Sequence, residues 1–271
     1  MARSALVCAR CDTPAHLDAT FCHNCGSALS FPAAGHPTNR VPWGFVDILK
    51  VIGLIVVGIV AIVGPALGVA ALVADDVERD PDALVVTIGA NFIWQVFIVV
   101  AVVLFSVRKY KVSWSALGFR WPRRGALWLP PLVVVASWTV LVVYFAIVTA
   151  IGGPDINDQE QIPDEAFESA QVIPFIALVS LAGAPVSEEV FFRGFMFQGL
   201  RSRWGILAAA GASGLLFGVV HVLPIVFIPF AIIGILFALS YVYSDSLYVP
   251  MAAHFLFNGI SLLINVIAAN T

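Results

Sequence analysis

Charged residues are scarce in this chain. Asp, Glu, Lys and Arg make up 11% of its 271 residues and hydrophobic residues 60%, whereas soluble domains carry about 25% charged residues. This composition excludes an ordinary soluble globular protein. It predicts an all-α fold, a polytopic bundle of transmembrane helices in which every backbone polar group is paired within the lipid.

Other absences narrow the function further. The basic residues form no patch away from the apolar segments, so we expect no nucleic-acid partner, and the net charge of −3 indicates no particular ligand. The first 45 residues lack the apolar core and cleavage site of a signal peptide. All four cysteines lie between Cys8 and Cys25, so no disulfide framework can staple the main body.

The apolar segments predict seven helices, most of them long enough to cross a bilayer. Their approximate bounds are 45–73, 84–107, 126–151, 171–200, 205–222, 224–243 and 247–269. We expect Pro174 and Pro185 to bend the fourth helix, and Pro185 is also suited to begin a new one. No internal repeat is evident.

Small residues within these segments are expected to let neighbouring helices pack closely. This expectation covers two groups of glycines, namely Gly211, Gly214 and Gly218, and Gly64 and Gly68.

The distribution of charge predicts the orientation in the membrane. The loops at 74–83 and 152–170 are acidic, and the loop at 108–124 is basic. Of the 14 Lys and Arg residues, all but Arg79 and Arg193 fall on one side of the seven-helix arrangement. The positive-inside rule then predicts a multi-pass plasma-membrane protein with a cytosolic N-terminus.

The fourth apolar segment contains Glu188, Glu189 and Arg193. Ionised groups in hydrocarbon cost several kcal/mol each, and they are hypotheses of a functional site by default. On a helix, Glu189 and Arg193 share a face and can pair, either as a structural ion pair or as part of a site. Glu188 projects about 100° away from Glu189 and is left for another task.

Two later segments add polar residues at helical spacing. His221 follows Phe217 by one turn, and Asn258 follows His254 by one turn. Measured from the basic side at 1.5 Å per residue, Glu189 and Asn258 lie roughly 18 Å deep, His221 roughly 24 Å and His254 roughly 12 Å. The depths overlap within helix tilt, so we expect one wet cavity near the middle of the membrane.

These side chains suit the hydrolysis of an amide bond. Glu188 and His221 can activate a water molecule by general base catalysis, and His254 and Asn258 can donate hydrogen bonds to an oxyanion. No Ser or Cys nucleophile is needed. The structural alternatives are a histidine satisfied within the core and an Asn258 that only bridges helices.

Three motifs in this order resemble the CPBP family, the CAAX protease and bacteriocin-processing intramembrane proteases. They are Glu188-Glu189-x-x-x-Arg193, Phe217-x-x-x-His221 and His254-x-x-x-Asn258. The resemblance covers about residues 110–269 and includes the lead-in Trp114-Ser-Ala-Leu-Gly-Phe-Arg120.

The resemblance implies a glutamate- and histidine-dependent intramembrane endopeptidase with a water-filled cavity that opens to the membrane. Glu188 and His221 would activate water, His254 and Asn258 would stabilise the oxyanion, and Glu189 and Arg193 would hold the shape of the site. A metal ion held by Glu188, His221 and His254 stays open. We favour the metal-free form, because these residues lack a compact motif such as H-E-x-x-H.

Other functions are compatible with the same residues. The family also includes bacteriocin self-immunity factors, so the alternative is a non-catalytic immunity or membrane adaptor protein that binds a peptide. A proton-coupled transporter is less favoured, because inverted repeats are lacking. The expected partners are membrane lipid and a peptide or protein substrate.

The N-terminal segment contains two Cys-x-x-Cys pairs, Cys8 with Cys11 and Cys22 with Cys25, separated by ten residues. Four thiolates at this spacing are typical of a tetrahedral zinc site, and Phe21-Cys-His-Asn-Cys-Gly26 resembles a short zinc ribbon. Metal binding would supply most of its folding energy. A redox or disulfide pair is less favoured, because the cytosol is reducing.

We therefore expect a structural zinc in residues 1–30, which are suited to bind a cytosolic partner. A linker rich in Pro and Gly follows at 31–44, and the transmembrane protease domain covers 45–271, with its motif-bearing core at about 110–269.

Overall fold

A computed structural model describes residues 6–7, 11, 13–15, 24–25, 41–154 and 162–271. The chain divides into two compact units, Met1–Asn39 and Arg40–Thr271. In the first unit, strands β1 (Leu6–Val7) and β2 (Pro14–Ala15) pair antiparallel, with Leu6 opposite Ala15. Cys11 and Cys25 belong to the described residues, whereas Cys8 and Cys22 lie outside them.

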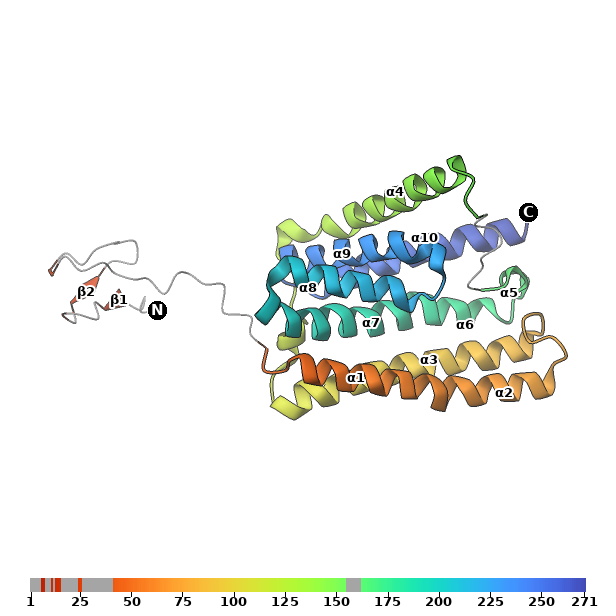
Figure 1. The fold of residues 1–271 in the computed structure, drawn as a ribbon, viewed down its shortest axis with the longest axis horizontal. Helices are drawn as coiled ribbons and strands as arrows, with labels where there is room; N and C mark the ends of the chain where they lie inside the picture. Colours follow the sequence, from red (N-terminus) through yellow and green to blue (C-terminus); the bar gives the residue numbers. More distant parts are fainter. Residues whose placement is uncertain (1–5, 8–10, 12, 16–23, 26–40, 155–161) are drawn as a thin grey trace. The chain divides into compact units, whose positions relative to one another are not determined.

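The second unit is a bundle of helices (Figure 1). Its α-helices are α1 (Phe45–Gly58), α2 (Gly64–Val73), α3 (Pro81–Val103), α4 (Leu129–Ala150), α5 (Asp164–Glu168), α6 (Ile173–Ala177), α7 (Ala184–Glu189), α8 (Gln198–Val220), α9 (Phe227–Ser244) and α10 (Tyr248–Ala269). Four π-helical stretches continue or join them, at Ile59–Val63, Leu104–Arg108, Leu178–Gly183 and Val190–Phe197. The prediction of an all-α polytopic membrane protein is confirmed.

Among the described residues, six helical stretches are long and apolar enough to cross a membrane, where seven helices were predicted. They are Phe45–Val73, Pro81–Arg108, Arg124–Ala150, Ile173–Val220, Pro224–Ser244 and Tyr248–Ala269. The 48-residue stretch Ile173–Val220 contains two of the predicted helices as its arms. The arms meet at Gly205, whose φ of 78° and ψ of 175° interrupt the helix, a conformation that glycine adopts readily because it has no Cβ.

The prolines of the first arm do not divide it. The backbone stays helical through α6, the stretch Leu178–Gly183 and α7, so Pro185 does not begin a separate helix. The π register accommodates the proline: the N–H of Ala184 donates to the carbonyl of Val179, five residues earlier. A π-bulge is one of the ways in which a helix absorbs such an interruption.

The acidic and basic connections lie at opposite ends of the bundle. Figure 1 shows the α2–α3 connection, α5 and the C-terminus at one end, and the start of α1, the α3–α4 connection and the α9–α10 turn at the other. At the acidic end, Arg79 Nε donates to Glu165 Oε1 over 3.0 Å. This hydrogen bond raises the pKa of Arg79.

The segment 114–120, which precedes the third span, is hydrogen-bonded to the turn between α9 and α10. Arg120 donates to Asp245 Oδ2 over 2.7 Å, and the N–H of Leu247 donates to the carbonyl of Gly118 over 2.8 Å. Gly118 has a φ of 97°, and a Cβ there would lie 2.5 Å from the ring of Tyr241. A glycine is therefore required at this position. The two hydrogen bonds to the α9–α10 turn fix where α10 begins.

Helices α8 and α9 approach closely at two of the predicted glycines. A Cβ on Gly214 would lie 2.6 Å from the carbonyl oxygen of Ala231, and one on Gly218 would lie 2.5 Å from that of Phe227. The prediction is wrong for the three others, Gly64, Gly68 and Gly211. Apart from the adjoining residues and backbone of the same helix, no atom of the described residues lies within 4 Å of a Cβ placed there.

Replacement of Gly214 should therefore separate α8 from α9. We expect Gly214→Ala to lower the free energy of unfolding by about 1–3 kcal/mol, the usual cost of overpacking, as measured by unfolding in mixed detergent micelles. Gly211→Ala is the matched control on the same helix and should be neutral or slightly stabilising, since alanine favours a helix more than glycine does. Equal losses for both variants would contradict this packing.

Candidate active site

The motif residues come from three parts of the bundle. Glu188 and Glu189 end α7, Arg193 lies in the stretch Val190–Phe197 that follows, and His221 lies at the C-terminal end of α8. His254 and Asn258 lie one turn apart on α10. Glu189 and Arg193 are fully buried, and His254 is 4% exposed. The other three side chains, those of Glu188, His221 and Asn258, are partly exposed.

The predicted pairing of Glu189 with Arg193 is confirmed. Arg193 Nη1 donates to Glu189 Oε1 over 2.9 Å, and Arg193 Nη2 donates to the carbonyl oxygen of Gly234 on α9 over 2.8 Å. His254 Nδ1 lies 3.0 Å from the same carboxylate oxygen. This buried cluster of Glu189, Arg193 and His254, which we call the ion cluster, ties α7, α9 and α10 together.

Aromatic rings complete the surroundings of the guanidinium. Arg193 Cζ lies 4.7 Å from the ring centroid of Phe217, 5.2 Å from that of Phe237 and 5.5 Å from that of Phe192. A desolvated cation over an aromatic face gains about 2 kcal/mol or more. The rings therefore offset part of the cost of burying this charge.

Phe217 has a role that the sequence analysis missed. Its ring centroid lies 4.7 Å from that of His221 and 6.1 Å from that of His254, in addition to its contact with Arg193. In the sequence, the i, i+4 spacing identified Phe217 only as the residue one turn before His221. Its contacts show that it separates and supports both imidazoles.

His221 is oriented by its own helix. Its Nδ1 lies 2.6 Å from the carbonyl oxygen of Phe217, and its ring stacks on Phe230 with centroids 4.2 Å apart. A carbonyl oxygen can only accept, so Nδ1 carries the hydrogen and Nε2 is the basic nitrogen of the neutral ring. In this tautomer, Nε2 is the atom that can accept a proton.

Glu188 shares an electrostatic neighbourhood with the histidines. Its charge acts on His221 and on Arg193, and His221 also interacts with His254. Its Oε2 atom is buried and accepts no hydrogen bond from the described residues. The structure thus brings Glu188 and His221 near the ion cluster, of which His254 is a member, with Glu188 outside the Glu189–Arg193 pair.

Asn258 is placed differently from its neighbour His254. Its Nδ2 donates over 2.8 Å to the carbonyl oxygen of Ser180, in the π-helical stretch before α7, whereas His254 Nδ1 faces Glu189. The predicted bridge between helices is therefore present. That His254 and Asn258 also aim at one oxyanion stays a prediction.

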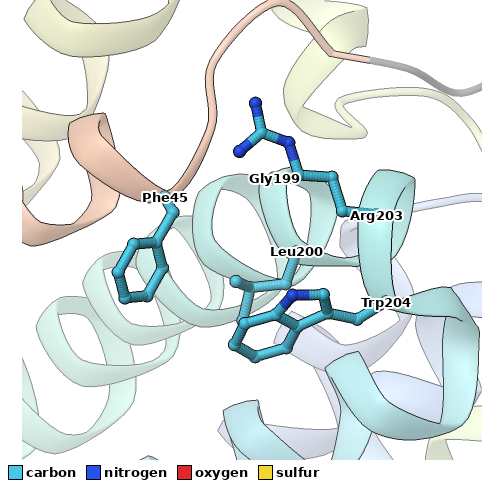
Figure 2. A pocket seen from close by; sticks show the side chains of 5 residues that line it. All are labelled: Phe45, Gly199, Leu200, Arg203 and Trp204. Atoms are coloured by element: carbon cyan, nitrogen blue, oxygen red, sulfur yellow. The ribbon is translucent and has the colours of Figure 1, made fainter.

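A cavity was expected here, and a metal ion held by Glu188, His221 and His254 was left open. No three His, Cys, Asp or Glu residues in the described part of the chain form a group that could hold a metal ion. A cavity of about 210 Å³ lies at a different place and is shown in Figure 2. Its lining consists of Phe45, Gly199, Leu200, Arg203 and Trp204. The wet pocket at the motif residues stays a prediction.

Comparisons with known proteins identify relatives of this chain. Residues 170–260 match the family described as type II CAAX prenyl endopeptidase Rce1-like. The protein named "Putative membrane peptidase YdiL" of Bacillus subtilis is 30% identical over 88 residues, which are 32% of this chain and 36% of that protein. The membrane-embedded CAAX protease MroQ of Staphylococcus aureus is 30% identical over 160 residues, 56% of this chain and 57% of that protein.

The chain thus covers about a third of one relative and just over half of the other. No solved structure matches it. The matched region 170–260 contains all six motif residues of the candidate site.

Removal of the buried cation tests how much the ion cluster stabilises the fold. We expect Arg193→Met to lower the free energy of unfolding by about 3–5 kcal/mol, because the Glu189 carboxylate is left buried without its counter-ion. The double variant Glu189→Gln/Arg193→Met should recover part of this loss, since no unpaired charge remains. Unfolding in mixed micelles measures both, with exposed Arg203→Met as the control. A double variant that loses the sum of both single effects would contradict the pairing.

Proposed function

We propose that the chain is a member of the CPBP family and an intramembrane endopeptidase, because residues 170–260 match the Rce1-like family and MroQ is 30% identical over 160 residues. Its substrate is a membrane-associated peptide or protein. The observation that carries the proposal is the meeting of Glu188, His221 and His254, from three helices, beside a buried ion pair in an apolar bundle. Ionisable groups at such depth are costly and point to a function.

Glu188 and His221 activate the attacking water in this proposal. The contact between His221 Nδ1 and the Phe217 carbonyl leaves Nε2 to accept a proton, and the nearby Glu188 carboxylate stabilises the imidazolium that forms. The water oxygen bonds to the scissile carbonyl carbon. The C–N bond then breaks as the proton passes to the leaving nitrogen, which gives a carboxylic acid and an amine.

His254 stabilises the oxyanion in its charged form. Its Nδ1 faces Glu189, so a neutral ring that donates from Nδ1 has no hydrogen on Nε2. Only the imidazolium offers an Nε2–H to a developing oxyanion, and the Glu189 carboxylate supports that charge. Asn258 contributes the second amide hydrogen that its bond to Ser180 does not use.

Glu189 and Arg193 hold this arrangement and take no part in proton transfer, because both are fully buried and bonded to each other. We propose the metal-free form of the reaction, since the motif residues lack the compact spacing of a helical zinc motif. We also propose that the protein lies in the plasma membrane with the basic end and the N-terminus in the cytosol. The separation of acidic and basic connections along the bundle supports this orientation.

Substitution of the water-activating pair tests this function. We expect Glu188→Gln and His221→Ala each to reduce peptide release by at least about 100-fold, the contribution of a general base, with no loss of membrane insertion. Mass spectrometry of peptides released from host membranes measures the effect, and the exposed Glu168→Gln on α5 is the matched control.

The opposite result would favour the non-catalytic alternative. If no peptide is released by the wild type, while peptide binding or protection of the host survives Glu188→Gln, the protein is an immunity factor or adaptor. A wild-type rate of release from either variant would show that the roles are assigned wrongly.

We also propose that the N-terminal unit binds one structural zinc ion through Cys8, Cys11, Cys22 and Cys25, as a site for a cytosolic partner. The described residues fit this proposal. Thr13 Oγ1 accepts from Asn24 Nδ2 over 2.9 Å and lies 3.2 Å from Cys11 Sγ. The two Cys-x-x-Cys segments therefore meet at Thr13, as ligands of a shared tetrahedral ion must. A bound zinc would supply the folding energy that so small a unit lacks.

Metal analysis of the purified full chain tests the zinc site. We expect about one zinc per chain in the wild type and a near-complete loss in Cys22→Ser, because three thiolates hold the ion far more weakly. His23→Ala removes a neighbouring imidazole and should keep the zinc. Retention of zinc by Cys22→Ser would contradict the four-thiolate assignment.

A further inference from the structure

The helix that carries Glu188 has a backbone acceptor without a partner in its own helix. In the stretch Leu178–Gly183, the N–H of Ala184 donates to the carbonyl of Val179, five residues earlier. In that register, the carbonyl of Ser180 would accept from the N–H of residue 185. Residue 185 is proline, which has no N–H.

The missing donor comes from another helix. Asn258 Nδ2 on α10 donates to the Ser180 carbonyl oxygen over 2.8 Å. An unpaired carbonyl in an apolar bundle is strongly unfavourable, since no bulk water replaces the lost bond. The Ser180 carbonyl is therefore a fixed acceptor for the Asn258 amide.

We propose that Pro185 is a positioning residue for the site. By withholding a backbone donor, it leaves the Ser180 carbonyl free to orient the carboxamide of Asn258. The bond decides which end of the amide is the nitrogen, and it sets the direction of the second amide hydrogen. Pro185 is buried and lies three residues before Glu188. In this proposal it acts through Asn258 and does not itself contact the reacting atoms.

The same bond sets the register of α10 against α7. Glu189 holds His254, and Ser180 holds Asn258 one turn further along α10. These two hydrogen bonds fix both the rotation and the axial position of α10 relative to the helix that carries Glu188. The orientation of His254 toward the scissile bond thus depends on both hydrogen bonds. This consequence for turnover rests on the proposed peptidase function, whereas the bond itself does not.

A double-mutant cycle tests the inference without reference to activity. Alanine at 185 supplies an N–H that can satisfy the Ser180 carbonyl within the helix. We expect Asn258→Ala to lower the unfolding midpoint of the wild type, and to lower it by less than half as much in the Pro185→Ala background. Pro174→Ala, a proline near the start of the same helical stretch, is the control and should leave the effect of Asn258→Ala unchanged. Additive losses in the Pro185→Ala background would overturn the inference.

Measurement of kcat and KM for the same variants distinguishes a role of Pro185 in positioning Asn258 from a role in stability alone. We expect Pro185→Ala to lower kcat by about tenfold, part of what one oxyanion donor contributes, with KM little changed. In the Asn258→Ala background it should lower kcat no further. If the stabilities couple but Pro185→Ala keeps the wild-type kcat, the bond is only a support and the positioning role is wrong. If the wild type has no peptidase activity, the proposed function fails and the stability cycle alone decides the inference.

Discussion

The buried pair of Arg193 and Glu189 is the interaction on which the rest of the site depends. A guanidinium with no exposed surface is tolerated in this bundle because a carboxylate, the Gly234 carbonyl and three aromatic rings surround it. The groups that offset the cost of burying the Arg193 charge come from several helices. This favourable arrangement therefore cannot form until those helices assemble. Because Glu189 also holds His254, the same charge that must be neutralised places the imidazole of α10 beside the helix of Glu188.

Much of this arrangement could be predicted from the sequence, because it follows from helical spacing and depth. The i, i+4 spacing of Glu189 and Arg193 predicted their pairing, and similar depths predicted that residues of the fourth, fifth and seventh apolar segments meet. Backbone acceptors have no such signature. The carbonyls of Gly234 and Ser180 are invisible in a sequence, although they bind Arg193 and Asn258. Phe217 was recognised only by its position before His221.

Other differences between prediction and structure also arise from contacts between helices, which the sequence does not show. Five glycines predicted close packing, but only Gly214 and Gly218 face a neighbouring backbone, because spacing within one helix does not show where its neighbour lies. Pro185 was expected to bend or begin a helix. Instead the helix changes register around it and leaves one carbonyl for a side chain of α10. The prediction that the proline interrupts the helix is thus correct. Its structural consequence is a hydrogen bond between two helices, from Asn258 to the Ser180 carbonyl.

Peptide hydrolysis by the Glu188 site is tested most directly by single-turnover cleavage of a synthetic membrane-spanning peptide. The purified protein is placed in lipid vesicles, where no other peptidase is present. We expect first-order formation of one pair of product peptides by the wild type, and a rate at least about 100-fold lower when the Glu188 carboxylate is replaced by an amide. No product from the wild type, or equal rates for the two proteins, would contradict it.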